Sequence, residues 1–352
     1  MKVLFDIGHP AHVHFFKNTI RILLDQGHDI SVVTKDKEIT IDLLKKYGIN
    51  HITLGKPGKG LWGKAKALFF FDWKLYKIAR AFKPDLSIGV GSPYLGHVSK
   101  LIRKPYISFW DTENAKLAIW LTYSFTDIIC TPSCFLNNLG NKQVKYTGYK
   151  EIAYLHPNYF SPNPNVLKEH GLRPEEKFII VRFVSWGASH DVGQHGIKDK
   201  IRFVKSLENF GRVIISSEGD LPPELKSYLM KISPEKLHDL LSYATLYAGE
   251  GATMASEAAV LGTPSIFMSS LAGNFGNLID LEETYDLLYS FTDTDAALDK
   301  AIEILKDKTS KEKWILKRER LLKDKIDVTA FMVWLIENYP KNIEDLRNRA
   351  VI

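Results

Sequence analysis

The chain has 352 residues, of which 45% are hydrophobic and 25% are charged, and its net charge is +6 at pH 7. This length predicts two globular domains of about 150–180 residues each. The mild charge, without a clustered basic motif, argues against a nucleic-acid binder, and two cysteines four residues apart argue against a disulfide framework or a zinc site. No run reaches about 18 uninterrupted apolar residues, so we expect a cytosolic protein without a signal peptide or membrane span.

Short apolar runs alternate with helical segments through the first half of the chain. Strands are predicted at Val3–Ile7, Ile30–Thr34, His51–Leu54, Leu86–Val90, Tyr106–Phe109, Ile128–Thr131 and Val144–Tyr146. Helices are expected from the GHPAHVHF turn to about Gln26 and over Leu68–Phe82, because glycine or proline breaks bound them. This alternation predicts a parallel, doubly wound sheet.

A linker and a second alternating series follow. The prolines and asparagines of Tyr154–Asn165 exclude a continuous helix or strand and therefore predict the linker. Further strands are predicted at Phe178–Phe183, Arg212–Ser216, Thr245–Ala248 and Pro264–Met268, and two closing helices at Lys311–Lys325 and Val328–Tyr339. The predicted domains are residues 1–153 and 166–325, joined by linker 154–165 and followed by a terminal segment, 326–352.

The stretch Gly249–Pro264, GEGATMASEAAVLGTP, carries the strongest functional signal. A strand ends, two glycines turn the chain, and a helix begins near Thr253. Unpaired N–H groups and the helix dipole suit a diphosphate there, and Glu257 one turn later can accept both hydroxyls of a ribose. The alternative is an ordinary strand–helix unit whose alanines pack on a sheet, and residue spacing alone leaves both open.

This stretch resembles the C-terminal signature of GT-B glycosyltransferases and of UDP-N-acetylglucosamine 2-epimerases. It is most similar to the UDP-GlcNAc transferases that complete lipid II, and the chain also resembles an uncharacterised, largely archaeal family of the same architecture. The resemblance implies a GT-B fold: two Rossmann-like doubly wound α/β domains facing a cleft, with a C-terminal helix that crosses back to the N-terminal domain. The first domain would bind the acceptor and the second the nucleotide sugar.

The turn GHPAHV, from Gly8 to Val13, resembles the GxGGHV turn of the lipid II family, with Pro10-Ala11 in place of the glycine pair. The resemblance implies that His12 is the general base that deprotonates the acceptor hydroxyl, work for which a near-neutral imidazole is suited. The alternative is a capped turn with solvent-facing histidines.

Two further segments resemble acceptor-side motifs. The loop after Leu86–Val90 is similar to a GMGGY-type loop, and Asp111–Ala115 is similar to an HEQNA segment in which Glu113 matches. The resemblance implies a catalytic role for Glu113 and acceptor contacts by Gly8, Gly91, Ser92, Asp111 and Asn114. The alternative for the second segment is a helix N-cap.

The donor side follows from the same resemblance. The segment Ser185–His190 stands where the family has a phosphate-binding GGSQG loop, and Gly273-Asn274 stands where it has two glutamines that hold the sugar. The implied donor-binding residues are Gly187, Ser189, Ile232, Ser233, Gly251, Ala252, Thr253, Met254, Ser256, Glu257 and Asn274. No metal or cofactor is expected, because Asp293-Thr294-Asp295 precedes a helical run and is interpreted as its N-cap.

The segment Gly58–Phe82 combines aromatic residues with five lysines. Such a composition favours a helix that lies on an anionic membrane, although part of it must be an ordinary core helix. A matching segment in the lipid II enzymes has the same GKG start and KPD end, which suits a lipid-linked acceptor. We therefore expect peripheral contact with the inner face of the cell membrane.

The resemblance implies an inverting, metal-independent transferase that moves a sugar from a UDP-sugar to a lipid-linked cell-envelope precursor. The first alternative is a nucleotide-sugar isomerase like the 2-epimerases, which carry an arginine after the first strand where this chain has Gly8-His9-Pro10. The second is a non-catalytic nucleotide-sugar-binding protein, which would tolerate the loss of His12.

Overall fold

The computed structural model describes residues 1–341 apart from Pro57, Lys59, residues 114–115 and residues 186–194, and it does not describe the side chains of Glu38, residues 60–67 and residues 116–117. The chain divides into two compact units. Unit 1 comprises Met1–Tyr154 together with the segment that begins at Ile326, and unit 2 comprises Leu155–Lys325.

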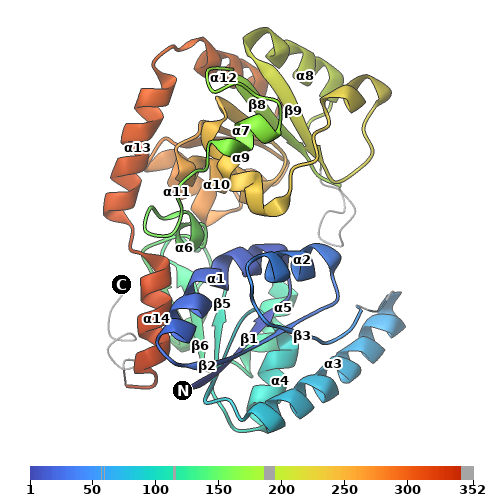
Figure 1. Cartoon of the computed structure of the whole chain (residues 1–352), viewed down its shortest axis with the longest axis vertical. Helices are drawn as coiled ribbons and strands as arrows, with labels where there is room; N and C mark the ends of the chain where they lie inside the picture. The colour runs from blue at the N-terminus through green and yellow to red at the C-terminus, as the bar shows by residue number, and fades with distance from the viewer. Residues whose placement is uncertain (57, 59, 114–115, 186–194, 342–352) are drawn as a thin grey trace. The chain divides into compact units, whose positions relative to one another are not determined.

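Unit 1, whose strands are drawn in blue to green in Figure 1, contains a seven-stranded parallel sheet in the order β3-β2-β1-β4-β5-β6-β7. Its strands are β1 (Lys2–Ile7), β2 (Asp29–Thr34), β3 (Ile52–Thr53), β4 (Leu86–Val90), β5 (Tyr106–Phe109), β6 (Ile128–Pro132) and β7 (Gln143–Tyr146). Its helices are α1 (Pro10–Asp25), α2 (Glu38–Lys46), α3 (Gly60–Phe82), α4 (Pro93–Leu101), α5 (Lys116–Tyr123), η1 (Gly140–Lys142) and α14 (Val328–Asn338), and α6 (Ile152–Leu155) lies at the boundary.

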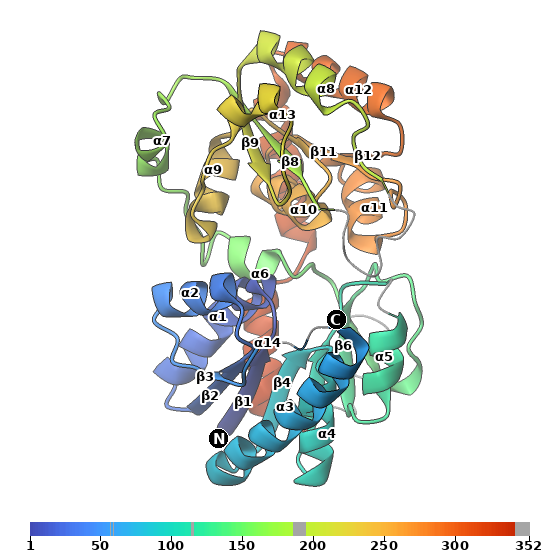
Figure 2. The ribbon, with the colours of Figure 1, turned by 90° about the vertical axis from the view of Figure 1, so that its right-hand side faces the viewer.

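The helices of unit 1 cover both faces of this sheet. Helix α1 packs against α2 and α14, whereas α4 packs against α3 and α5, and Figure 2 shows the two groups on opposite sides. This follows from right-handed crossovers that run one way from β1 to β3 and the other way from β4 to β7. Apolar side chains of β1 therefore have a helix layer on each side, and Val3, Leu4 and Phe5 are fully buried.

Unit 2 contains a five-stranded parallel sheet in the order β12-β11-β10-β8-β9. Its strands are β8 (Phe178–Phe183), β9 (Arg212–Ser217), β10 (Leu246–Gly249), β11 (Ser265–Met268) and β12 (Leu288–Phe291). Its helices are α7 (Asn165–Glu169), α8 (Lys200–Leu207), η2 (Glu208–Phe210), η3 (Pro223–Tyr228), η4 (Pro234–Lys236), α9 (Leu237–Tyr243), α10 (Ala252–Leu261), α11 (Gly276–Glu283), α12 (Thr294–Lys306) and α13 (Ser310–Asp324).

The last helix, α14, packs on the first unit. The Thr329 hydroxyl donates to the Ala153 carbonyl at 2.7 Å, and the Phe331 ring stacks on Tyr146 with centroids 5.4 Å apart. Its apolar sequence is explained by this burial, because Val328, Met332 and Leu335 are fully buried.

The predicted α/β class with two parallel sheets is confirmed, and three predicted strands, Leu86–Val90, Tyr106–Phe109 and Phe178–Phe183, agree with the structure at both ends. The pattern missed β12, a short edge strand that is only partly buried. The strand predicted at Thr245–Ala248 begins and ends one residue before β10.

Candidate functional site

The predicted residues of unit 1 gather where its central strands end. In β1, Ile7 lies opposite Thr34 of β2 and Asp6 lies opposite Gly89 of β4. The strand order reverses between β1 and β4, and open parallel sheets bind ligands at such a reversal beside the carboxyl ends. The described catalytic and acceptor-side candidates follow β1, β4 and β5 at this edge: Gly8, His12, Gly91, Ser92, Asp111 and Glu113.

His12 lies in the first turn of α1, where its ring is partly exposed but its Nδ1 is buried and has no hydrogen-bond partner among the described residues. The neighbouring His9 caps the helix, and the two rings are 5.8 Å apart. Burial and the nearby His9 lower the pKa of His12 to about 3, which Asp111 opposes and Lys150 and Lys35 reinforce. The imidazole is therefore neutral at pH 7 but is a weaker base than the near-neutral one that the sequence suggests.

Asp111 is paired with a lysine that the sequence analysis did not single out. Lys150, four residues after the end of β7, forms a salt bridge with Asp111 and lies 3.8 Å from Glu151 Oε1. Burial raises the pKa of Asp111, but the Lys150 charge and hydrogen bond outweigh this and hold it below its usual 3.8. Glu113 is buried, and its backbone carbonyl accepts a hydrogen bond from Asn137 Nδ2 at 3.1 Å. A Lys-Glu pair shortly after a predicted strand was the available signal for Lys150.

The glycine-rich loop after β4 is held from within the unit. Gly91 has a φ of +52°, and a side chain at this position would overlap the Trp110 ring, so the loop needs glycine there. The Gly91 N–H donates to Ser108 Oγ at 3.1 Å, and the Ser92 N–H donates to the Tyr106 hydroxyl at 3.0 Å. Ser92 Oγ also caps α4. Neither N–H is free for an acceptor phosphate, and acceptor contact by other atoms of this loop stays a prediction.

Two charged residues at this edge were missed by the sequence analysis. Asp6 is 3% exposed within β1, and its Oδ1 has no hydrogen-bond partner in the described part of the chain. Burial raises the pKa of Asp6, although Lys35 and a hydrogen bond with Ser92 oppose the change. The Lys35 ammonium, directly after β2, lies 4.7 Å from the centroid of the Tyr94 ring. A lone aspartate inside an otherwise apolar strand was the signal available for Asp6.

In unit 2 the strand order reverses between β8 and β10, where Arg182 lies opposite Gly249. A Cβ on Gly249 would lie 2.6 Å from the Arg182 carbonyl oxygen, so the strands approach too closely for any other residue. The Arg182 guanidinium donates to Ser216 Oγ at 2.6 Å and forms a salt bridge with Glu218. An arginine at the carboxyl edge of a sheet suits an anionic ligand, and the sequence analysis did not identify it.

Helix α10 begins at this same edge. Its N-cap residue, Gly251, has no side chain to accept the first N–H groups, and Gly251, Ala252 and Thr253 are partly exposed. Residues 254–260 of the helix are buried. The first turn thus presents backbone donors without a side-chain cap, the arrangement that binds phosphate at helix N-termini.

Glu250 fixes the segment beside this helix. Its carboxylate is buried, and it accepts the Val184 N–H at 2.9 Å and the Ile197 N–H at 2.8 Å. A side chain on Gly196 would overlap this carboxylate. Glu250 therefore holds both ends of the connection between β8 and α8 next to the start of α10, a role that its place in the glycine turn did not reveal.

Glu257 is 4% exposed, and its Oε1 lies 3.0 Å from Nε2 of the buried His238 on α9. Ser256 is fully buried, and its hydroxyl donates to the Thr253 carbonyl at 3.1 Å. Both residues belong to the stretch of α10, residues 254–260, that is buried throughout. Ribose binding by Glu257 stays a prediction, and His238 fixes the carboxylate that would perform it.

The other donor-side candidates lie on loops. Ile232 and Ser233 are partly exposed just before η4, and Asn274 is exposed between β11 and α11, where its N–H donates to the Leu271 carbonyl at 3.1 Å. Asn114, Gly187 and Ser189 lie outside the described residues.

The predicted N-cap at Asp293 is confirmed. Its Oδ1 accepts the N–H groups of Asp295 and Ala296 at 3.0 and 2.9 Å at the start of α12. Asp295 pairs instead with Arg202, at 2.8 Å. The two carboxylates of this triplet are thus used in structural contacts.

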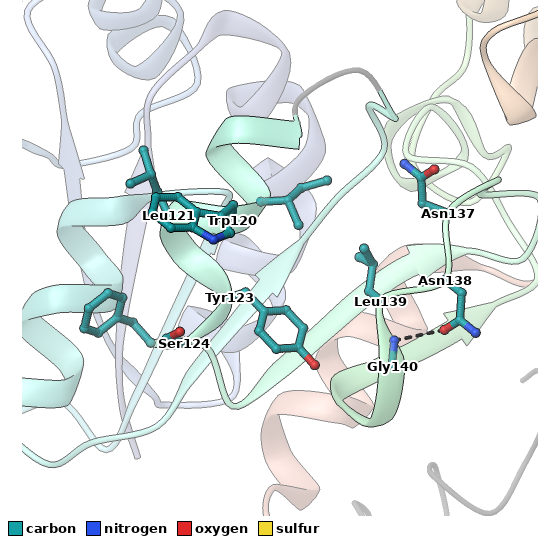
Figure 3. A pocket seen from close by; sticks show the side chains of 10 residues that line it. Trp120, Leu121, Tyr123, Ser124, Asn137, Asn138, Leu139 and Gly140 are labelled. Atoms are coloured by element: carbon teal, nitrogen blue, oxygen red, sulfur yellow. Dashed lines mark hydrogen bonds between the residues drawn. The ribbon is translucent and has the colours of Figure 1, made fainter.

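Exposed aromatic side chains occur on α3 and α5. On α3, Phe69, Phe70 and Trp73 are 75%, 49% and 54% exposed. On α5, Trp120 is 73% exposed and lines a hollow of about 830 Å³, which Figure 3 shows between this helix and residues 137–140. None of the predicted site residues lines this hollow. Within the described residues, no helix is long and apolar enough to pass through a bilayer.

Several solved structures share this fold. The UDP-GlcNAc 2-epimerase of Neisseria meningitidis, solved with UDP-GlcNAc, has a TM-score of 0.66 at 12% identity, over 97% of this chain and 100% of that one. S. aureus MnaA, solved with UDP, has a TM-score of 0.67 at 13% identity, over 98% and 97%. The glycosyltransferase VinC, in complex with dTDP, has a TM-score of 0.64 at 10% identity, over 96% and 99%. Identities this low show the fold alone, and that fold is the GT-B fold.

Two sequence comparisons agree with the expected likeness to an uncharacterised, largely archaeal family. An uncharacterised protein of Methanocaldococcus jannaschii is 24% identical over 281 residues, which cover 76% of this chain and 81% of that protein. A family model matches residues 1–336, almost the whole chain. The chain therefore belongs to the family described as "Protein of unknown function (DUF354)".

Proposed function

We propose that the protein is a glycosyltransferase that moves a sugar from a UDP-sugar to a lipid-linked acceptor of the cell envelope. The observation that carries the proposal is the start of α10, where uncapped backbone N–H groups lie at the carboxyl edge of the unit 2 sheet, with Glu257 one turn further. In this proposal the N–H groups of the first turn bind the diphosphate, and the Glu257 carboxylate binds the ribose. The fold shared with enzymes solved with UDP and UDP-GlcNAc supports a uridine nucleotide.

The acceptor in this proposal binds at the carboxyl edge of unit 1. His12 would accept the proton from the acceptor hydroxyl, because its neutral imidazole is in the protonation state that a general base requires. Asp111 forms a salt bridge with Lys150, and the charge of its carboxylate would stabilise the imidazolium as it forms. Metal independence and an inverting course belong to the same proposal.

The lipid-linked acceptor and a peripheral membrane location are supported by α3. Phe71, Leu75 and Ala79 are buried at four-residue spacing, while Phe69, Phe70 and Trp73 face solvent. The Lys77 ammonium lies 3.7 Å from the centroid of the Trp73 ring. Exposed aromatics beside lysines suit the interface of an anionic bilayer.

A nucleotide-sugar 2-epimerase is the second candidate, favoured by solved epimerases that superpose over nearly the whole chain. An epimerase converts the nucleotide sugar without an acceptor. Against it, the first turn of this chain reads Gly8-His9-Pro10 and contains no arginine, although the epimerase resemblance requires one.

Incubation with a panel of UDP-sugars, with and without polyprenyl-phosphate-linked acceptors, tests the proposal. A transferase releases UDP only when sugar and acceptor are both present. Conversion of a UDP-sugar to its epimer without an acceptor would replace the proposal by the second candidate. Binding of UDP without release or conversion under any combination would indicate a non-catalytic binding protein.

A further inference from the structure

We propose that Lys35 binds a phosphate group of the acceptor at the carboxyl edge of unit 1, beside Gly8 and His12. The inference rests on the proposed function, since it names the charged part of the acceptor that this edge would hold. Phosphate or diphosphate esters are the class of ligand meant, whether lipid-linked or water-soluble.

The strand register places Lys35 at this edge. Ile7 of β1 lies opposite Thr34 of β2, so the residues that follow them, Gly8 and Lys35, leave the sheet side by side. The Lys35 Nζ lies 3.8 Å from the position that a Cβ on Gly8 would take. The partly exposed Lys35 ammonium therefore lies beside the turn that leads to His12.

The Lys35 ammonium is held in place without being neutralised by a close ion pair. It lies over the Tyr94 ring and is half-buried, and among the described residues no carboxylate oxygen lies within ion-pair distance of it. Asp6 is the nearby carboxylate, and it is buried below the edge within β1. A cation oriented by an aromatic ring, with its charge still available, suits a phosphate.

The loop after β4 does not supply the backbone donors that would bind an acceptor phosphate, so a cation is the remaining candidate. The N–H groups of Gly91 and Ser92 are donated to Ser108 and Tyr106, so the glycine-rich loop does not offer them to an anion. Lys150, the other lysine that influences His12, is already paired with Asp111. Of the two lysines that lower the pKa of His12, Lys35 is therefore the one without a carboxylate in ion-pair distance among the described residues.

A phosphate beside Lys35 would also act on His12. The Lys35 and Lys150 charges contribute to the lowered pKa of His12, so a bound anion that offsets Lys35 raises this pKa and makes the imidazole a stronger base. Acceptor binding and activation of the base are in this way linked through one lysine.

The test is a titration of the full chain with pyrophosphate in the presence of saturating UDP. Binding is monitored through the imidazole ¹⁵N resonances of His12. Lys35→Met is expected to weaken pyrophosphate at least tenfold, while Lys35→Arg retains most of the affinity. Lys17→Met is the matched control, because Lys17 also lies over a tyrosine ring, 4.4 Å from the centroid of Tyr47, but in the body of α1. Both Met variants change the net charge equally, so long-range effects cancel.

Equal affinity of Lys35→Met and Lys17→Met for pyrophosphate, or no response of His12 to pyrophosphate in the wild type, would overturn the inference. A parallel titration with farnesyl diphosphate distinguishes the source: tighter binding assigns a lipid-linked ester and equal binding a water-soluble one, and both support the phosphate site. Because His12 reports on unit 1, this result is separate from UDP binding at α10, whose absence would instead contradict the proposed function.

Discussion

In the proposed function, His12 is the residue that would act as the general base. Its Nδ1 is buried, and burial lowers its pKa to about 3, so the ring is unprotonated at neutral pH. His12→Asn should lower sugar transfer by about 10²–10⁴, the usual contribution of a general base, while UDP affinity changes little. Steady-state transfer and calorimetric UDP binding check this.

His9→Asn is the control for this prediction, since asparagine is also a good N-cap and His9 caps α1. Transfer at the wild-type rate by His12→Asn would assign the base elsewhere, with Asp111 or Glu113 the next candidates. His14 is unsuited as a control because it is buried against Tyr47 and Tyr154.

The lowered pKa of His12 also predicts a pH dependence of stability. Between about pH 3 and 6.5 the unfolded chain binds a proton at this residue that the folded chain does not. The free energy of unfolding is therefore highest above pH 6.5 and falls as the pH falls toward 3. Urea denaturation at pH 7 and pH 5 should show a smaller decrease for His12→Asn than for the wild type.

At the scale of single residues, the sequence points to residues inside local motifs but not to residues whose contacts are distant along the chain. Glu257 and His12 were proposed as site residues because each stands in a motif after a predicted strand. Arg182 and Glu250 were not, because their contacts are with residues 34 or more positions away along the chain. A single sequence does not show such contacts.

Among the elements, α3 has two faces with different roles. Its buried face closes the core of unit 1, and its other face exposes Phe69, Phe70 and Trp73. The full chain should float with anionic vesicles, and this binding should decrease as salt rises, because surface charges are screened over about 8–10 Å at ordinary ionic strength. Replacing the three exposed aromatics by serine should abolish flotation.

Trp334→Ser is the control for the α3 variant, since Trp334 is also partly exposed but lies on α14, whose partner α1 belongs to the other helix layer. Equal partitioning of the wild type into neutral and anionic vesicles would contradict an electrostatic contribution. No flotation at all would contradict membrane contact by α3.

At the scale of the whole molecule, hydrophobic alternation was sufficient to predict two parallel sheets, because the central strands β1, β4, β8 and β10 are buried over most of their length. It failed where burial is incomplete, as at the edge strand β12. The resemblance supplied what periodicity cannot, namely the GT-B fold and the identity of the residues at the ends of the strands.

The central claim is that a uridine nucleotide binds at α10, with Glu257 holding both hydroxyls of its ribose. The measurement is calorimetric titration of UDP and 2′-deoxy-UDP into the wild type and into Glu257→Gln, which preserves an oxygen for His238. Glu283→Gln, an exposed glutamate of α11, is the control. A charge-assisted hydrogen bond is worth about 1.5–3 kcal/mol, so the wild type should prefer UDP at least tenfold.

The account predicts that Glu257→Gln loses most of this preference and that Glu283→Gln keeps it. A merely structural Glu257 would weaken both nucleotides equally and leave their ratio unchanged. A wild type that binds UDP and 2′-deoxy-UDP with the same affinity, or binds neither, would contradict the account.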